Sequence, residues 1–455
     1  MPAAADQDSA RIARFARSRG CKGRRFLTGA TICKIRRDCK PRGHAPLPAN
    51  CHLPDVLPWS RPNLGVRFMH VRPFRIAIDD DALTDLRMRL DAVRWPSALD
   101  AESWDDGASL AFLKRLIAYW RDRFDWRAQE ARLNRLPQFL ADIDSLSIHF
   151  IHQRGNGPSP IPLVLTHGWP GSFFEMEKIV PLLTDPASHG GDAMDAFHVV
   201  VPSLPGYGFS DAPRQPGVGP HHIAELWHKL MAGLGYNRFG LQGGDIGAGV
   251  STWLAHRFPE DVIALHLNYI PGSYRPPLGG GLAPVSEEEQ AFLENSAKWT
   301  DAEGAYAHQH GTKPQTLAYA LTDSPVGLAA WMVEKFRSWS DCDGDVTRAF
   351  TLDDLLTEIS LYWFSGTLAS SLRLYKEGRR RPLHFVAGDR ITPPTAVAMF
   401  PHELPMPPRS WVERCYNLVR WTQMAKGGHF AAMEQPELLA GDIRAFFRPF
   451  RAGSQ

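Results

Sequence analysis

Ten residues between a predicted strand and a predicted helix decide the fold: Phe239-Gly240-Leu241-Gln242-Gly243-Gly244-Asp245-Ile246-Gly247-Ala248. The apolar start of this stretch predicts a short buried strand, and Val250, Trp253 and Leu254 give the residues after it the apolar face of a helix. Small residues on both sides of an acid allow a sharp strand-to-helix turn and a close approach of neighbouring chain. Asp245 stands at the apex of that turn.

Further apolar runs on both sides of this unit predict a sheet. Strands are expected at residues 162–166, 197–201, 262–269, 383–387 and 418–421, and a hairpin at 139–143 and 146–151. Helical patterns are expected between and after them, at residues 175–183, 222–234 and 436–447. Because strands and helices alternate, the sequence predicts an α/β protein with a mostly parallel, doubly wound sheet.

Two regions depart from the alternation. Residues 76–123 carry an amphipathic helical pattern, and residues 272–376 are almost wholly helical in pattern, with helix starts at Ser324-Pro325 and at Thr351. We therefore expect an N-terminal helical meander and a helical cap inserted into the sheet domain. The expected segments are a basic, disordered leader (1–68), the meander (69–135), the first part of the core (136–271), the cap (272–380) and the second part of the core (381–455).

Charge and cysteine content exclude several classes of function. Residues 1–68 hold 14 of the 51 Lys and Arg residues but only 4 of the 49 Asp and Glu residues, so the rest of the chain is mildly acidic. Such a body lacks the basic surface of a nucleic-acid binder. Four of the six cysteines lie in the leader without zinc-ligand spacing, and the remaining two suit a reducing, cytoplasmic compartment. We expect the functional protein to begin near Met69, without a transmembrane helix.

The identity of the residue at the apex decides the chemistry. An aspartate that attacks a carbonyl would form a labile anhydride, whereas attack on a saturated carbon forms an ordinary ester. The substrate of Asp245 should therefore carry an sp³ electrophile. Cleavage of the ester by water then requires a general base and an oxyanion hole.

The candidate residues for the base and its supporting acid come after Asp245 in the chain, in the order nucleophile, acid, histidine. His429 lies on the loop after the last predicted strand, and it is the candidate base. The acid that orients it is Asp389 or Glu403, and spacing alone favours Asp389. The backbone N–H groups of Ile246 and Trp169 are the expected oxyanion donors.

From about Val71 onward, roughly five-sixths of the chain, the sequence resembles epoxide hydrolases of the microsomal type, which have the α/β-hydrolase fold and an N-terminal meander. The motifs that carry the resemblance are His167-Gly168-Trp169-Pro170-Gly171-Ser172, Gly243-Gly244-Asp245, Asp323-Ser324-Pro325-Val326-Gly327-Leu328-Ala329-Ala330, Leu374-Tyr375-Lys376-Glu377 and Gly427-Gly428-His429-Phe430-Ala431-Ala432.

The resemblance implies addition of water to an epoxide, through an aspartyl ester, to give a vicinal diol. It also implies two cap tyrosines that hydrogen-bond the epoxide oxygen. Tyr375 matches one of them, and Tyr306 is expected as the other, with Tyr274 and Tyr319 as alternatives. The family's Phe-Pro-x-acid pattern selects Glu403 over Asp389 as the acid. No cofactor and no metal are expected.

Two departures from the family pattern bear on the substrate and the location. Ile246 stands where the family often has Trp, which should alter the shape of the pocket more than the chemistry. The membrane anchor of the microsomal enzymes is absent, so a soluble, bacterial-style, cytoplasmic relative is expected. Its expected partners are a small epoxide and water. Binding to nucleic acid and a membrane anchor are not expected, and the protein could form a homodimer.

Two other functions compete with this interpretation. A haloalkane dehalogenase also uses an Asp nucleophile, but it needs halide-binding donors, commonly a Trp directly after that Asp, where this chain has Ile246. A non-catalytic, ligand-binding relative would be expected to have lost part of the catalytic set. Every catalytic role has a candidate residue in this chain, which favours an enzyme.

Overall fold

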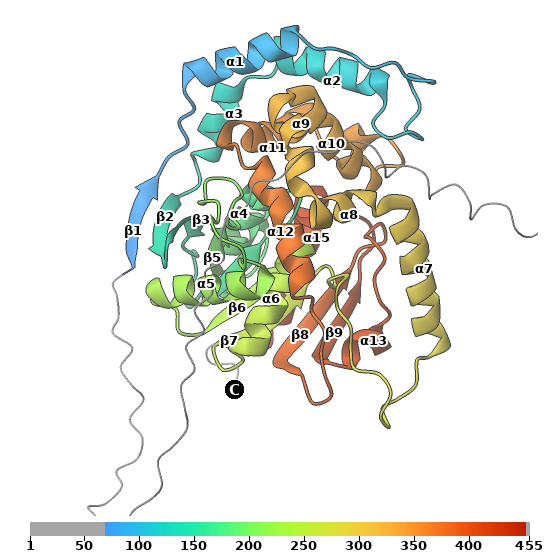
Figure 1. The fold of residues 1–455 in the computed structure, drawn as a ribbon. Helices are drawn as coiled ribbons and strands as arrows, with labels where there is room; N and C mark the ends of the chain where they lie inside the picture. The colour runs from blue at the N-terminus through green and yellow to red at the C-terminus, as the bar shows by residue number, and fades with distance from the viewer. Residues whose placement is uncertain (1–68, 452–455) are drawn as a thin grey trace, which may run out of the picture. The chain divides into compact units, whose positions relative to one another are not determined.

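A nine-stranded sheet runs through the part of the chain that the computed structural model describes, residues 69–451 (Figure 1). The strand order is β1-β2-β3-β5-β4-β6-β7-β8-β9. The strands are β1 (His70–Phe74), β2 (Gln138–Ile143), β3 (Leu146–Gln153), β4 (Ile161–Thr166), β5 (Phe197–Pro202), β6 (Phe239–Gly243), β7 (Val262–Leu267), β8 (Ile391–Met399) and β9 (Tyr416–Gln423). The first three strands and their junction with β5 are antiparallel, and the others pair in parallel. The expected leader at 1–68 lies outside the described residues.

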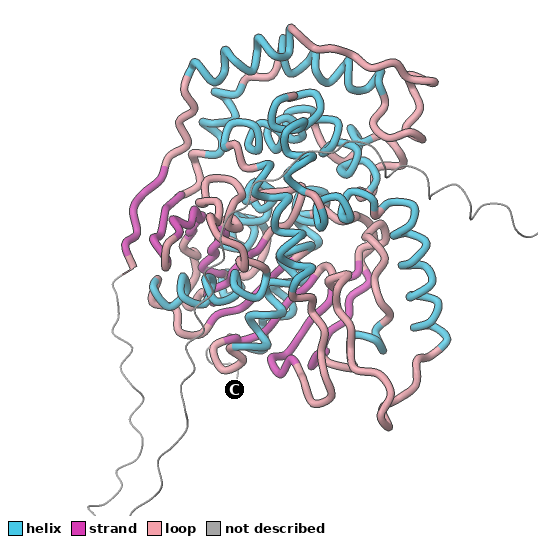
Figure 2. The backbone as a smooth tube through the Cα atoms, viewed as in Figure 1, coloured by secondary structure: helices cyan, strands magenta, loops and turns pink. Residues whose placement is uncertain are grey.

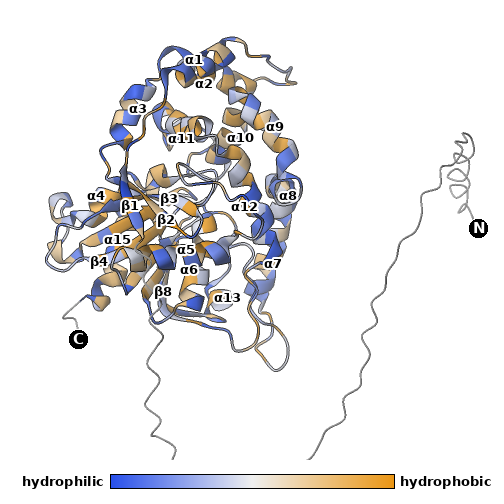
Figure 3. Ribbon diagram, turned by 60° about the vertical axis from the view of Figure 1, so that its left-hand side comes forward, coloured by the Kyte–Doolittle hydropathy of each residue, from blue (hydrophilic) through white to orange (hydrophobic). Residues whose placement is uncertain are grey.

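The central strands form because their side chains are apolar on both faces. Leu163, Leu165, Val199 and Val201 are fully buried, as parallel strands covered by helices on both sides require. Figure 3 shows the hydrophobic residues gathered on the sheet and on the helix faces turned toward it. The prediction of a mostly parallel, doubly wound sheet is confirmed.

Helices cover the two faces of this sheet. The helices α5 (Pro220–Gly233) and α6 (Asp245–Arg257) pack together on one face, and α4 (Ile179–Thr184) packs with α15 (Pro436–Phe447) on the other (Figure 1). The predicted helix at 175–183 is divided into the 3₁₀ turn η1 (Phe173–Met176) and α4. Pro181 explains the division, since proline has no N–H to donate and fits only in the first turn of a helix.

The predicted strand at residues 383–387 is wrong. His384 makes only an isolated bridge to Arg275, and the strand that pairs with β7 and β9 is β8, at Ile391–Met399. Its Pro393 and Pro394 cannot donate to a ladder, and they coincide with an irregularity in the register between Ile391 and Thr395. Pairing with β7 accordingly begins only at Thr395.

The helical segments at the N-terminus and between β7 and β8 pack against each other (Figure 1). The N-terminal helices are α1 (Asp80–Asp91), α2 (Leu110–Asp122) and α3 (Trp126–Leu133). The helices between β7 and β8, here called the cap helices, are α7 (Glu287–Glu303), α8 (Ala305–Thr312), α9 (Pro314–Asp323), α10 (Pro325–Ser338), α11 (Leu352–Ser365) and α12 (Leu368–Arg380). Arg89 donates to the Asp323 carbonyl at 2.7 Å, and the Tyr119 hydroxyl donates to Asp353 at 3.0 Å, so polar contacts join the two groups.

The predicted helix starts are confirmed, and the gaps between helices were not foreseen. Ser324 and Thr351 cap α10 and α11 through their side chains. Residues 92–109 and 272–286 are loops (Figure 2), although both were expected within helical regions. Within residues 69–451, none of the helices combines the length and the apolar character needed to cross a bilayer.

One buried carboxylate ties α15 to the sheet. Asp442 accepts hydrogen bonds from His266 on β7 at 3.0 Å and from Arg420 and Thr422 on β9 at 2.8 and 2.9 Å. Burial raises the pKa of Asp442, but these hydrogen bonds outweigh burial and lower it to about 2. A carboxyl whose pKa falls on folding stabilises the fold at neutral pH, and that stabilisation is lost as the pH falls through the folded pKa.

We therefore expect Asp442→Ala to lower the free energy of unfolding at pH 7 by about 3 kcal/mol, because it leaves buried donors without a partner. The difference from wild type should narrow as the pH falls from about 4 toward 2. Urea denaturation followed by circular dichroism measures both effects. Glu413→Ala, which removes an exposed partner of Arg409, is the control and should cost less than about 1 kcal/mol. Equal losses in the two variants would contradict the assignment.

Candidate active site

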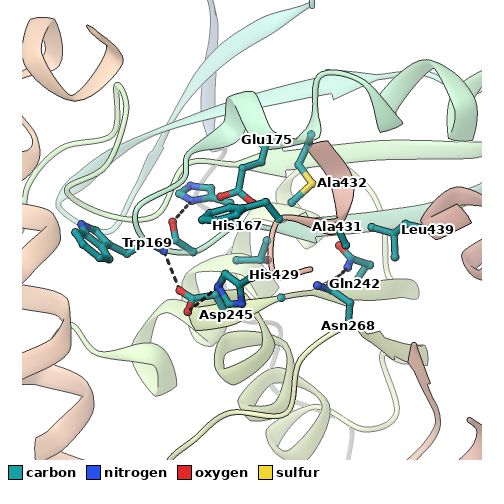
Figure 4. A pocket seen from close by; sticks show the side chains of 15 residues that line it. His167, Trp169, Glu175, Gln242, Asp245, Asn268, His429, Ala431, Ala432 and Leu439 are labelled. Carbon is teal, nitrogen blue, oxygen red and sulfur yellow. Dashed lines mark hydrogen bonds and ion pairs between the residues drawn. The ribbon is translucent and has the colours of Figure 1, made fainter. Parts of the chain in front are cut away.

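The strand-to-helix turn places Asp245 in a backbone conformation that few residues adopt. β6 ends at Gly243, α6 begins at Asp245, and Asp245 has a φ of 45°. The turn depends on missing side chains, since a Cβ on Gly247 would lie 1.9 Å from the Thr166 carbonyl oxygen. A Cβ on Gly168 would lie 2.1 Å from Asp245 Oδ1. The end of β4, with the loop after it, thus lies close against the turn that carries Asp245 (Figure 4).

The loop after β4 supplies a hydrogen bond to this carboxylate. The Trp169 N–H donates to Asp245 Oδ1 at 2.8 Å. His167 holds the loop in place by accepting from the Leu204 N–H at 3.2 Å. Burial lowers the pKa of His167 to about 4, so its ring is neutral at physiological pH and can accept this bond. The Ile246 N–H lies in the first turn of α6, where amides have no partner within the helix.

His429 lies between two carboxylates. Its Nδ1 is 2.5 Å from Glu403 Oε1, and its Nε2 is 3.5 Å from Asp245 Oδ2. Burial by itself lowers the pKa of His429, but the charge of Glu403 and the contact with Asp245 outweigh burial and raise it well above its usual value. Asp389 lies elsewhere. It precedes β8, and its carboxylate accepts from the Val386 N–H at 2.9 Å.

The histidine loop is held by contacts that the sequence analysis did not identify. Glu434 accepts from the backbone N–H groups of Asp341, Gly428 and Phe430 at 2.8 to 3.0 Å. The His429 N–H donates to the Trp339 carbonyl at 2.8 Å. Trp339 and Asp341 directly follow α10, so the loop that carries His429 is bonded to the segment between α10 and α11. Glu434 lies five residues after His429, but only the fold shows which amides it binds.

Two of the four candidate tyrosines lie close to Trp169 and near the charge of Asp245. The ring centroids of Tyr306 on α8 and Tyr375 on α12 are 5.5 and 5.9 Å from that of Trp169. Burial, together with the charge of Asp245, raises the pKa of both phenols well above the usual value, so both are protonated donors at neutral pH. The alternatives lie elsewhere, because Tyr274 donates to the Trp411 carbonyl at 3.1 Å and Tyr319 is 72% exposed.

A second buried acid lies near Asp245 and His429. Glu175 is on η1, and burial raises its pKa to about 8, with the charge of Asp245 adding to the effect and His429 opposing it. At neutral pH this carboxyl therefore holds a proton. Glu175 falls in the predicted helix at 175–183, and no sequence pattern marks it as a site residue.

This arrangement has the parts needed to attack an sp³ carbon and then hydrolyse the resulting ester. Asp245 Oδ1 accepts from the Trp169 N–H, and Oδ2 lies on the side of His429. Protonated phenols on the cap side can donate to an opening oxygen, and the His429–Glu403 pair can accept a proton from water. Each of these groups is supplied by a different segment of the chain.

Comparison with known proteins adds independent findings. Residues 71–176 match the family described as epoxide hydrolase N terminus, and residues 161–436 match the α/β-hydrolase fold family. A Stigmatella aurantiaca protein with the provisional name of epoxide hydrolase is 46% identical, over 84% of this chain and 86% of its own length. Epoxide hydrolase 1 of Oryctolagus cuniculus is 42% identical, over 86% and 91% of the two chains.

Solved structures agree with the sequence matches. The Aspergillus niger epoxide hydrolase has a TM-score of 0.72 at 33% identity, covering 83% of this chain and 96% of its own. The juvenile hormone epoxide hydrolase of Bombyx mori has a TM-score of 0.71 at 30% identity, covering 85% of this chain and 96% of its own.

The close approach at the turn yields a prediction for two glycines of the same helix. Gly247→Ala places a Cβ against the Thr166 backbone, so we expect it to lower the free energy of unfolding by about 2 to 3 kcal/mol. Gly249→Ala is the matched control, because its Cβ would find no atom closer than 3.9 Å. It should leave stability unchanged or raise it by up to about 1 kcal/mol through helix propensity. Thermal unfolding measures both, and a tolerated Gly247→Ala would refute the close approach.

Proposed function

This chain belongs to the epoxide hydrolases of the α/β-hydrolase fold, and we propose that its catalytic residues are Asp245, His429, Glu403, Tyr375 and Tyr306, with Trp169 and Ile246 as the oxyanion hole. The reaction adds water to an epoxide to give a vicinal diol. The observation that carries the assignment is the convergence of the Trp169 N–H and His429 on the two oxygens of one carboxylate. We further propose that residues 272–380 act as the cap that holds the epoxide over Asp245.

The first chemical step is ring opening. Asp245 Oδ2 attacks an epoxide carbon, the carbon–oxygen bond of the ring breaks, and the oxygen takes a proton from Tyr306 or Tyr375. A phenol suits this task because it stays protonated in the free enzyme and its hydrogen bond strengthens as negative charge develops on the oxygen. The product of this step is an ester between Asp245 and the substrate carbon.

The second step is hydrolysis of the ester. It depends on how the charge of Asp245 affects the pKa of His429. In the free enzyme the carboxylates of Asp245 and Glu403 keep the pKa of His429 high. Ester formation removes the charge of Asp245, so the pKa of His429 falls and the ring can act as a base. Water then attacks Asp245 Cγ, gives a proton to His429 Nε2, and leaves negative charge on Oδ1, which the Trp169 and Ile246 N–H groups stabilise.

Collapse of this intermediate breaks the bond between Cγ and Oδ2. The departing alkoxide takes the proton back from His429, so the diol leaves with the former Oδ2 and the water oxygen replaces it in Asp245. The proton that stays on the Asp245 carboxyl then returns to the tyrosinate, which restores the carboxylate and the phenol. An assay of the purified protein against terminal, aromatic and fatty epoxides tests the function directly. Diol formation supports it, and halide release from haloalkanes without diol formation would contradict it.

We also propose that the protein is cytoplasmic and that it forms a homodimer. The two cysteines of the body, Cys342 and Cys415, are free and buried, which supports a reducing compartment such as the cytoplasm. A homodimer is tested by light scattering of the purified protein.

Removing the nucleophile or the base should stop the reaction at different points. Asp245→Ala should abolish turnover, since no ester can form. His429→Gln should still form the ester but not hydrolyse it, so intact mass spectrometry should show the enzyme heavier by one substrate molecule. Diol production by Asp245→Ala at the wild-type rate would refute the mechanism.

The acid that supports the base is tested by two amide substitutions. Glu403→Gln should lower kcat at least about 100-fold, because the charge that stabilises protonated His429 is lost. Asp389→Asn is the matched control and should change kcat less than about threefold, since Asp389 only accepts a hydrogen bond from its own loop. A larger loss in Asp389→Asn than in Glu403→Gln would reverse the assignment.

A further inference from the structure

A small cavity lies beside Asp245, on the side of the sheet domain. It has a volume of about 20 Å³, and Asp245 and His429 form part of its wall. The other lining residues are Thr166, His167, Gly168, Trp169, Glu175, Met176, Gln242, Gly244, Asn268, Phe430, Ala431, Ala432 and Leu439. All of them come from the sheet domain, and neither Tyr306 nor Tyr375 is among them. The cavity is therefore separate from the cap side, where the epoxide meets the phenols.

The volume suits one small molecule. A cavity needs roughly 10 to 15 Å³ of space open to the centre of a water molecule to hold one water. The space beside Asp245 exceeds this threshold but leaves no room for an organic substrate. A buried water must also find two to four polar partners.

Gln242 offers the first of these partners. Its Nε2 donates to Asn268 Oδ1 at 2.7 Å, which leaves its carbonyl oxygen as the free end of the amide. That oxygen is buried and has no hydrogen-bond partner within the protein. A buried acceptor without a partner lowers the stability of the fold. We therefore expect a hydrogen-bond donor, such as a water, in the cavity that Gln242 lines. Figure 4 shows Gln242 bonded to Asn268, with His429 between this pair and Asp245 in the view.

Two further polar groups complete the set. His429 Nε2 faces Asp245 Oδ2 at 3.5 Å, too long for a direct hydrogen bond of normal geometry. Glu175 holds a proton at neutral pH, because burial raises its pKa to about 8, and it can therefore donate. Once the ester has formed and His429 is neutral, a water in the cavity has one donor, Glu175, and two acceptors, Gln242 Oε1 and His429 Nε2, among the lining residues.

We propose that this cavity holds the water that hydrolyses the aspartyl ester, and that Gln242 Oε1 is the acceptor that orients it. The inference rests on the proposed function. One proton of the water points to Gln242 Oε1 and the other to His429 Nε2, so a lone pair is free to attack Asp245 Cγ. On attack, the second proton passes to His429 Nε2 as the new carbon–oxygen bond forms, and the Cγ–Oδ2 bond then breaks. The epoxide and the water thus reach Asp245 from opposite sides.

The test separates formation of the ester from its hydrolysis. Wild type and variants are mixed with an epoxide substrate, quenched at successive times, and weighed as intact proteins, which gives the two rates independently. Gln242→Leu should slow hydrolysis of the ester at least tenfold, change its formation less than twofold, and let the adduct accumulate. Loss of a purely structural hydrogen bond would slow both steps or neither.

A control and a second variant make the test decisive. Ser251→Ala removes another buried, unpartnered oxygen from the neighbouring helix α6, outside the cavity lining, and should leave both rates within twofold of wild type. Ala432→Val narrows the cavity without touching a polar group and should also slow hydrolysis alone. If Gln242→Leu does not fold, Ala432→Val gives the decisive measurement.

The outcomes distinguish this inference from the function on which it rests. Absence of any adduct in His429→Gln with every epoxide tested would contradict the covalent mechanism itself. An adduct that forms in Gln242→Leu and Ala432→Val, and is hydrolysed within twofold of the wild-type rate, would overturn the water site alone. Equal slowing of both steps would also overturn it.

Discussion

The absence of β-carbons around Asp245 is the constraint on which the site depends. A left-handed backbone conformation at a residue other than glycine costs on the order of 1 to 3 kcal/mol, and the surrounding structure must compensate for it. Compensation comes from packing, because Gly247 lets α6 approach β4, and Gly168 lets the loop after β4 approach the carboxylate. The same proximity that strains the backbone at Asp245 brings the Trp169 N–H within hydrogen-bonding distance. Strain and reactivity therefore have a common origin in these glycines.

The sequence predicted those elements whose signals lie within a few consecutive residues. The unit formed by β6 and α6 and the helix α15 follow from apolar periodicity and from small residues at the turn, and the structure has them at the predicted places. The strand β8 could not be found in this way, because its two prolines argue against a strand and an apolar run eight residues earlier resembles one. Pairing with β7 and β9, which is remote in sequence, decides its position. This error explains why spacing alone favoured Asp389, since the true strand ends at Met399, just before Glu403.

The site residues also divide into those with a local sequence signal and those that only remote contacts reveal. Asp245, His429 and Trp169 stand in compact motifs, so they could be named from the sequence, and Glu403 and the tyrosines could be named from the family pattern. Glu175, Gln242 and Glu434 carry no such signal, because each is a polar residue whose meaning comes from groups far away in the chain. Glu434 is an ordinary helix glutamate until the fold brings three amides to it. Such residues are visible only when burial and hydrogen-bond partners are known.

The hydrogen bonds between the histidine loop and the residues after α10 have a mechanical consequence. The amide of His429 is bonded to the Trp339 carbonyl, and the Gly427 N–H donates to Asp341 at 2.8 Å. A cap that swung away as a rigid lid would pull on the loop that carries the base and would break both bonds. Opening of the cap helices at this place would therefore also displace the loop that carries His429. Any movement of the cap helices that keeps both bonds must therefore leave residues 339–341 in place beside the histidine loop.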